Sequence, residues 1–131
     1  MTKLRLLLLV VSLGLWGCSR GDGLVIAPVE GKIVMNGKPL PDVGVTFLPD
    51  AAGPSASGNT NENGEFTLRT AEPGDGAVVG SHKVVLGPAQ EGRPKPGSAA
   101  IPNKYGSPTT TDITAEVVAG KRNTFTFELK P

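Results

Sequence analysis

The strongest constraint on the fold is a run of alternating residues and tight turns between positions 29 and 69. In residues 29–35, aliphatic residues and one glycine mostly alternate with polar residues, which predicts a half-buried β-strand. Asn36 and Gly37 follow, and this pair is a strong signal for a hairpin turn because both residues tolerate a positive φ. A second alternating segment covers residues 43–48. The whole stretch predicts short strands connected by tight turns.

The same period of two predicts five more strands. The third and fourth meet across an asparagine-rich turn at residues 61–64, and a turn at residues 119–122 separates the last two. The five are Ala56–Thr60, Glu65–Thr70, Gly80–Gly87, Asp112–Val118 and Asn123–Leu129. No segment of ten residues has the helical period of 3.6, so these seven short strands predict an all-β sandwich around one core.

The alternation also predicts which side chains face the core. In the fifth strand, Val84 and Leu86 are expected to point inward. All four phenylalanines fall on predicted core faces, and the only tryptophan is Trp16. Tyr105 is therefore the one aromatic residue beyond position 17 that we expect to be available for stacking against a sugar, which disfavours a carbohydrate-binding role.

The N-terminal residues have the pattern of an export signal. Lys3 and Arg5 precede an apolar run over residues 6–15, which is shorter than the roughly 20 residues that a membrane-spanning helix needs. The run ends at Leu15-Trp16-Gly17-Cys18, which resembles the lipobox of bacterial lipoproteins. The resemblance implies that residues 1–17 are a lipoprotein signal peptide. It also implies cleavage before Cys18, a lipid on its sulfur and an acylated amino terminus.

Cys18 is the only cysteine, so an intrachain disulfide is excluded. A free thiol is a liability in an exported protein, and acylation removes it. The alternative is an ordinary secretory signal that happens to precede a cysteine. With the lipobox interpretation, residues 18–28 are the lipidated cysteine and a short tether. Several acyl chains, at about 0.8 kcal/mol per buried methylene, then attach the chain permanently to a membrane of the bacterial cell envelope.

The residue after the cysteine bears on which membrane this is. By resemblance to a sorting rule of some Gram-negative bacteria, Ser19 favours the outer membrane, with the domain facing the periplasm or the cell surface.

Four segments of the predicted sandwich resemble a known family. They are Gly31-Lys32-Ile33-Val34, Asn36-Gly37-Lys38-Pro39-Leu40, Val43-Gly44-Val45-Thr46-Phe47 and Asn63-Gly64-Glu65-Phe66-Thr67-Leu68. With the C-terminal strand pair, they resemble a carboxypeptidase regulatory-like domain of the kind found in planctomycete lipoproteins. The resemblance implies a seven-stranded antiparallel Greek-key β-sandwich of transthyretin-like (prealbumin-like) topology, here assigned to residues 29–131. It implies no peptidase activity, because the domain is an accessory to the carboxypeptidases after which it is named.

The charge balance excludes one large class of partner. Lysine and arginine number 13 and aspartate and glutamate 12, which gives a formal net charge of +1. This balance lacks the electrostatic footprint of a nucleic-acid-binding protein. The partners that we expect are the membrane, through the lipid, and a protein of the envelope.

The titratable residues predict no catalytic or metal site. His82 is the only histidine, and its neighbour Ser81 must point to the opposite face of the strand, so the two cannot form a dyad. We expect His82 to face solvent. Asp112 and Glu116 share a strand face but lie roughly 13 Å apart at ~3.3 Å per residue, too far to share a proton. One histidine and an acylated cysteine do not make a zinc site. We therefore expect no enzyme activity, no metal and no cofactor.

Asn59, Asn61, Asn63 and Gly64 imitate the start of a calcium-binding loop. The acidic ligand that such a loop needs at its twelfth position is missing, because that position is Thr70. Asparagine and glycine are also the residues that a tight hairpin turn requires, and we favour the turn.

Residues 87–111 form a long predicted loop with several prolines. Loops beyond about 15 residues without regular structure are usually functional or disordered. One interpretation is a disordered first half and a second half that Tyr105 pins to the sandwich. The other is a partner-binding loop that uses Arg93, Lys95, Lys104 and Tyr105.

Together these observations predict a lipid-anchored β-sandwich of the cell envelope with a structural or protein-binding role. Exposed strand edges leave binding by strand addition open. The alternative is an accessory or small-ligand (carbohydrate or peptide) binding module of an envelope enzyme system.

Overall fold

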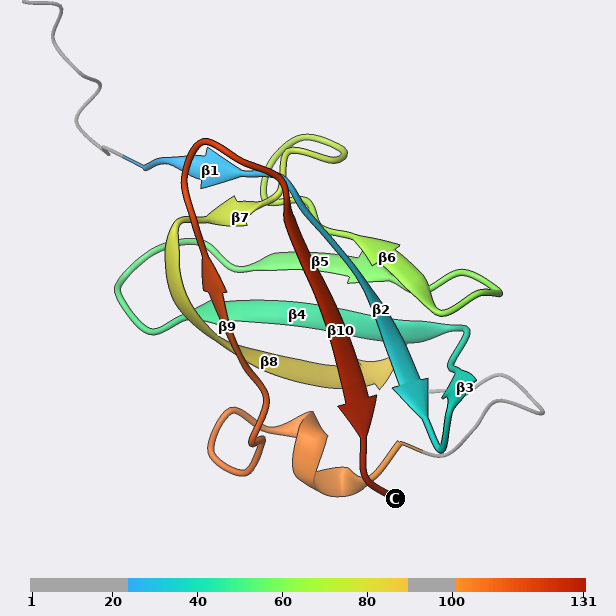
Figure 1. Ribbon diagram of the computed structural model, residues 1–131. Coiled ribbons are helices and arrows are strands. Elements are labelled where there is room, and N and C mark those ends of the chain that lie inside the picture. Colours follow the sequence, from blue (N-terminus) through green and yellow to red (C-terminus); the bar gives the residue numbers. More distant parts are fainter. Residues whose placement is uncertain (1–23, 90–100) are drawn as a thin grey trace, which may run out of the picture.

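The structure is a computed structural model that describes residues 24–89 and 101–131 (Figure 1). The predicted signal peptide, Cys18 and the first part of the tether lie outside the described residues, as do Arg93 and Lys95. The described residues form ten β-strands and one turn of 3-10 helix, without an α-helix. The prediction of an all-β fold is confirmed. Within these ranges no helix has the length and apolar character needed to cross a membrane.

Two four-stranded sheets pack against each other, and a small third sheet covers one end. The first sheet comprises β2 (Val29–Met35), β3 (Lys38–Pro39), β6 (Glu65–Thr67) and β10 (Asn123–Leu129). The second comprises β4 (Val43–Pro49), β5 (Ala56–Asn59), β8 (Gly80–Pro88) and β9 (Thr114–Val117). The third is the pair β1 (Ile26–Ala27) and β7 (Ala77–Val78), and the helical turn is η1 (Asn103–Gly106).

The order of the strands places β2 in the middle of the first sheet, with β10 on one side and with β6 and β3 on the other. The second sheet has the order β5-β4-β8-β9. In Figure 1, β2 and β10 run across the strands of the second sheet, so the two layers enclose the core between them.

Each predicted strand overlaps an observed one, with differences at the strand ends, and the two-residue strands β1, β3 and β7 were not predicted. The turn at Asn36 and Gly37 is present, with φ angles of 54° and 75°, and joins β2 to β3. The predicted strand Glu65–Thr70 ends early, as β6, because the chain then crosses to the second sheet. There Arg69 forms an isolated bridge with Ser57 of β5.

The prediction that all strand pairs are antiparallel is wrong for one pair. β10 runs parallel to β2 over seven residues, from the pair Asn123–Val29 to the pair Leu129–Met35. The other strand pairs of the described residues are antiparallel. Alternation along a strand reveals which face is buried, but it carries no information on the direction of a partner that lies almost a hundred residues away.

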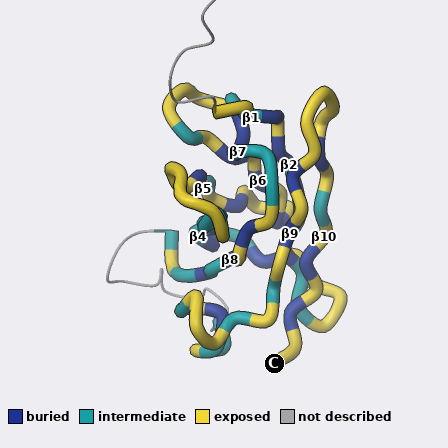
Figure 2. The backbone as a smooth tube through the Cα atoms, turned by 90° about the vertical axis from the view of Figure 1, so that its left-hand side faces the viewer, coloured by how far each residue is buried: buried dark blue, intermediate teal, exposed yellow. Residues whose placement is uncertain are grey.

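Aromatic rings fill the centre of the core. Phe47 of β4 lies with its ring centroid 6.5 Å from Phe66, 5.8 Å from Phe125 and 6.1 Å from Phe127. The rings of Phe125 and Phe127 stack on each other with their centroids 5.7 Å apart. These residues come from both large sheets, and the buried segments in Figure 2 alternate with exposed ones as a two-layer sandwich requires. The rings therefore join the two layers.

Gly31 of β2 lies against the Phe66 ring and the backbone of Phe125. A Cβ atom at this position would lie 2.6 Å from the carbonyl oxygen of Phe125 and 2.6 Å from Cζ of the Phe66 ring. Real Cβ atoms do not approach other atoms so closely, and one of the two neighbours is backbone that moves only if β10 moves. The packing of the rings thus requires a residue without a side chain at the centre of the sheet.

We expect the substitution Gly31→Ala to lower the free energy of unfolding by about 1–3 kcal/mol, because the methyl group overpacks the core. Chemical denaturation of the full chain measures this loss. The matched control is Gly87→Ala on β8, where an added Cβ meets nothing within 4 Å. An equal loss of stability in both variants would contradict the steric explanation.

Candidate functional site

The residues with catalytic potential do not converge. Ser81 is exposed, and its hydroxyl donates a hydrogen bond to the carboxylate of Glu116 on β9. His82, the next residue, points to the opposite face, as predicted from strand geometry. Asp112 forms an ion pair with Lys104, with the Nζ and Oδ2 atoms 3.4 Å apart. Each acidic residue that was considered for acid–base chemistry is therefore bound to a different partner.

The prediction that His82 faces solvent is wrong. Its side chain is fully buried, with the ring centroid 5.5 Å from that of Phe47. The Nε2 atom lies 2.6 Å from the carbonyl oxygen of Val78, and no group in the described part of the chain forms a hydrogen bond with the buried Nδ1 atom. The sequence contained the signal for this. His82 lies two and four residues before Val84 and Leu86, which were expected to point inward, and residues two apart on a strand point to the same face.

The asparagine-rich segment forms a turn. The Oδ1 atom of Asn61 accepts hydrogen bonds from the backbone N–H groups of Asn63, at 2.9 Å, and Glu65, at 3.0 Å. These bonds close the turn between β5 and β6, the role that the composition of the turn predicted. The two strands do not form a hairpin, because β5 pairs with β4 in the second sheet and β6 pairs with β2 in the first. Within the described ranges, no three His, Cys, Asp or Glu side chains gather as metal ligands would.

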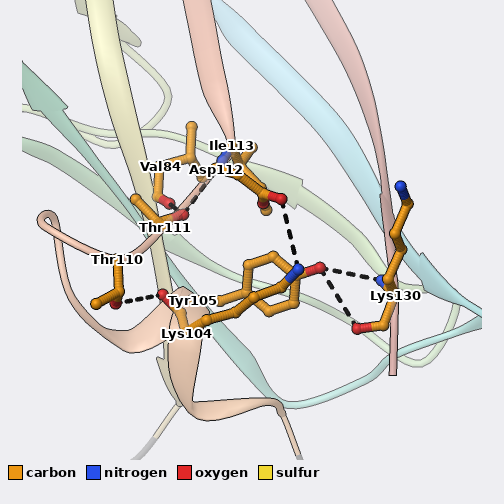
Figure 3. Close-up of polar contacts among 8 residues, drawn as sticks. All are labelled: Val84, Lys104, Tyr105, Thr110, Thr111, Asp112, Ile113 and Lys130. Atoms are coloured by element: carbon orange, nitrogen blue, oxygen red, sulfur yellow. Dashed lines mark hydrogen bonds and ion pairs between the residues drawn. The ribbon is translucent and has the colours of Figure 1, made fainter.

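The second half of the long loop packs against the sandwich through Tyr105 of η1 (Figure 3). The Tyr105 ring is buried, and its hydroxyl accepts a hydrogen bond from the backbone N–H of Lys130 at 3.0 Å. The predicted packed second half of the loop is thus present. The ring is not available as a sugar platform, contrary to our expectation, and it is not part of an exposed docking surface.

Lys104 is the one basic residue of the proposed partner-binding loop whose position is described. A side-chain hydrogen bond to Tyr105 and the negative charge of Asp112 raise the pKa of Lys104 above its ordinary value. Its ammonium group also lies 4.8 Å from the centroid of the Tyr105 ring. Lys104 is therefore engaged locally, and Arg93 and Lys95 lie outside the described residues.

Asp75 organises the loop between β6 and β7. Its carboxylate accepts hydrogen bonds from the backbone N–H groups of Thr70 at 2.6 Å, Ala71 at 3.0 Å and Glu72 at 2.9 Å. Desolvation raises the pKa of Asp75, but these backbone hydrogen bonds together outweigh it and lower the pKa below its ordinary value. The folded state therefore favours the ionised carboxylate.

This shift predicts a pH-dependent contribution to stability. The ionised Asp75 stabilises the fold above its ordinary pKa, and the stabilisation is lost as the pH falls through the lowered pKa of the folded state. We expect Asp75→Asn to be less stable than the parent chain at neutral pH, with a difference that shrinks as the solution is acidified. Thermal unfolding between pH 7 and pH 2.5 measures this, and a difference that is constant with pH would contradict it.

An open groove of about 490 Å³ lies on the outward face of the first sheet. Most of its lining side chains alternate along three neighbouring strands: Thr124, Thr126, Glu30, Lys32, Glu65 and Thr67. Asn59 and Asn61 border it. The lining offers hydroxyl, amide, ammonium and carboxylate groups, which suit a polar ligand. Of the two aromatic residues in the lining, Phe66 is buried in the core and Phe125 is partly buried and packs against the core.

Next to this groove, β10 forms the outer edge of the first sheet among the described strands. The N–H of Asn123 donates to the carbonyl of Pro28, at 2.8 Å, so the backbone groups of residue 123 face β2. Because backbone direction alternates along a strand, the groups of residues 125, 127 and 129 face β2 as well. The N–H and C=O groups of Thr124, Thr126 and Glu128 then point away from the sheet. We call these three residues the free edge of β10.

The far end of this edge is closed by η1. Lys130 lies two residues beyond Glu128, so its backbone groups also point away from the sheet. Its N–H donates a hydrogen bond to the Tyr105 hydroxyl. The hydrogen bonds at Asn123 and at Lys130 thus agree on the direction of the backbone groups between them. Sequence reasoning did not locate this edge, since the position of a strand in a sheet depends on pairing that alternation does not reveal.

Comparisons with known proteins add a distant likeness to one solved structure. No protein-family model matches the chain, and no curated protein matches it. Among solved structures, the chain is similar to the dioxygenase domain of a novel dioxygenase carbohydrate-binding protein fusion from the cellulolytic bacterium Streptomyces sp. SirexAA-E. The sequences are 22% identical, the match covers 86% of this chain and 84% of that chain, and the TM-score is 0.41. This likeness is too low to assign a family or an activity.

Proposed function

We propose that the chain is a lipid-anchored, protein-binding β-sandwich of the bacterial cell envelope that acts without catalysis. The observation that carries the binding role is the free edge of β10. Unpaired N–H and C=O groups along a strand edge form hydrogen bonds readily with another extended chain. In this role Thr124, Thr126 and Glu128 supply the backbone groups, and a partner extends the first sheet by one strand.

The family assignment is part of the same proposal. The segments around the Asn36–Gly37 turn resemble carboxypeptidase regulatory-like domains of planctomycete lipoproteins, which implies a Greek-key, transthyretin-like order of the strands. Strands occur in all seven predicted positions, which is compatible with this topology. A domain of this type serves as an accessory or scaffold, and the separate engagement of Ser81, His82 and Asp112 is compatible with such a role.

Attachment to the membrane is proposed on the sequence of residues 15–18. We expect the mature chain to begin at Cys18 and to carry a diacylglyceryl group and a fatty acyl group there. Mass spectrometry of the protein purified from membranes measures this, and Cys18→Ser is expected to prevent both lipidation and cleavage. A mature chain with a bare thiol at position 18 would refute the anchor.

The binding role is tested by Thr126→Pro in the full chain. Proline removes the outward N–H at the middle of the free edge, and an edge strand tolerates it because that N–H makes no bond within the sheet. We expect crosslinks to envelope proteins in the native membrane to be lost, while the far-ultraviolet circular dichroism spectrum is retained. The control is Thr126→Ala, which keeps the N–H and should keep the crosslinks. Unchanged crosslinks in the proline variant would contradict binding at this edge.

A second candidate, a small-ligand (carbohydrate or peptide) binding module, is favoured by the groove beside β10. Its polar lining is the observation in support. Binding of the full chain to a glycan or peptide array, weakened by Lys32→Ala and unaffected by Lys38→Ala on β3, is the expected result. Equal binding by the two variants, or none by the parent chain, would remove this candidate.

A further inference from the structure

Among the described residues, the free edge of β10 lacks most of the features that usually prevent strand addition. Proteins protect exposed edges with proline, charged side chains (lysine above all), a β-bulge or a covering loop. β10 has the sequence Asn-Thr-Phe-Thr-Phe-Glu-Leu, with one charged residue, Glu128, and neither proline nor lysine, and its register with β2 is continuous over seven residues. Thr124, Thr126 and Glu128 are all exposed. Such an edge is suited to pairing.

The side chains of β10 are arranged almost symmetrically about Thr126. Phe125 and Phe127 flank it on the inward face, and Thr124 and Glu128 flank it on the outward face. If a second β10 strand runs antiparallel with its own Thr126 opposite this one, then Phe125 faces Phe127 of the other copy, and Thr124 faces Glu128. In this register no two like charges of the strands oppose each other. The strand is therefore complementary to itself.

The backbone direction fits the same register. In an antiparallel pair, directly opposed residues whose backbone groups face the partner exchange two hydrogen bonds. Opposing Thr126 to Thr126 and Thr124 to Glu128 uses every outward N–H and C=O group of the free edge. The Tyr105 hydroxyl already forms hydrogen bonds with the backbone N–H and C=O of Lys130. The paired segment therefore ends at Glu128, the last residue whose outward backbone groups are available.

The inward face gains contacts as well. Phe125 is only partly buried, although its neighbours in the ring cluster are buried. A strand added at this edge places Phe127 of the other copy beside Phe125, and the twofold symmetry repeats the contact. Cross-strand aromatic pairs of this kind stabilise sheets, and they cover the apolar surface that the single chain leaves accessible.

We propose that the partner at the free edge of β10 is a second copy of this chain, in an antiparallel pair centred on Thr126 that joins two four-stranded sheets into one of eight. This inference rests on the proposed function in taking the same edge as the binding surface, and it names the partner. A twofold interface of this type is closed, because each free edge satisfies the other.

The register predicts opposite effects for two substitutions at one position. Thr124→Lys places an ammonium group opposite Glu128 of the second copy, and Thr124→Glu places a like charge there. Two such pairs form in each dimer, so we expect Thr124→Lys to lower the dimer dissociation constant and Thr124→Glu to raise it, each by roughly two- to thirty-fold. Analytical ultracentrifugation of the full chain in density-matched detergent measures both constants.

Thr67 provides the matched control. Thr124 and Thr67 lie directly on either side of Glu30, on β10 and β6, and both are exposed on the same face. Lysine or glutamate at either position meets the same charge within the chain, but only position 124 meets Glu128 of the second copy. Thr67→Lys and Thr67→Glu should leave the dissociation constant unchanged.

The possible outcomes separate this inference from the proposed function. Opposite shifts for the two Thr124 variants, together with a monomeric Thr126→Pro variant, support the dimer. A parent chain that is monomeric at every concentration overturns the inference, as do shifts of the same sign in the two Thr124 variants. If the parent chain is monomeric and the Thr126→Pro substitution still abolishes the crosslinks to envelope proteins, the edge binds a different protein and the proposed function stands. If the parent chain is monomeric and the Thr126→Pro variant keeps these crosslinks, both the dimer and the proposed function are wrong.

Discussion

The contact between the phenylalanine rings and Gly31 is the constraint on which the rest of the structure depends. The rings of Phe47, Phe66 and Phe125 come from three strands that are far apart in sequence, and the Phe66 ring occupies the space that a side chain at position 31 of β2 would need. A two-stranded hairpin is marginal by itself, so each strand is stable only once this cluster forms. The spacing between the two sheets is set at the same point, because the rings occupy the space between them.

The sequence predicted where the strands are better than how they pair. Period-two alternation located every strand longer than two residues, and the turn at Asn36 and Gly37 has the positive φ angles that its residue types favour. The direction of β10 was not predictable, since alternation is identical in parallel and antiparallel neighbours. The burial of His82 was predictable from the period of two that it shares with Val84 and Leu86, but histidine is polar, and its polarity favoured an exposed position.

The candidate binding surface was the least visible feature in the sequence. The alternation of β10 would be the same if another strand were paired with its outer side. Its position at the edge follows only from the order of the strands in the sheet. The direction of its backbone groups follows from the hydrogen bond of the Asn123 N–H to the Pro28 carbonyl, and its far end is closed by the hydrogen bond of the Lys130 N–H to the Tyr105 hydroxyl. The loop that sequence reasoning favoured for binding instead uses Tyr105 to close one end of that edge.

The parallel pairing of β2 and β10 has a mechanical consequence. Both strands start at the same end of the molecule, so the described chain enters near β1 and leaves at the opposite end, beyond Leu129 (Figure 1). A tensile force between these two points runs along the strands and in opposite directions on β2 and β10. All the hydrogen bonds between the two strands then bear the load together in shear, whereas a hairpin pulled at its open end would release them one after another.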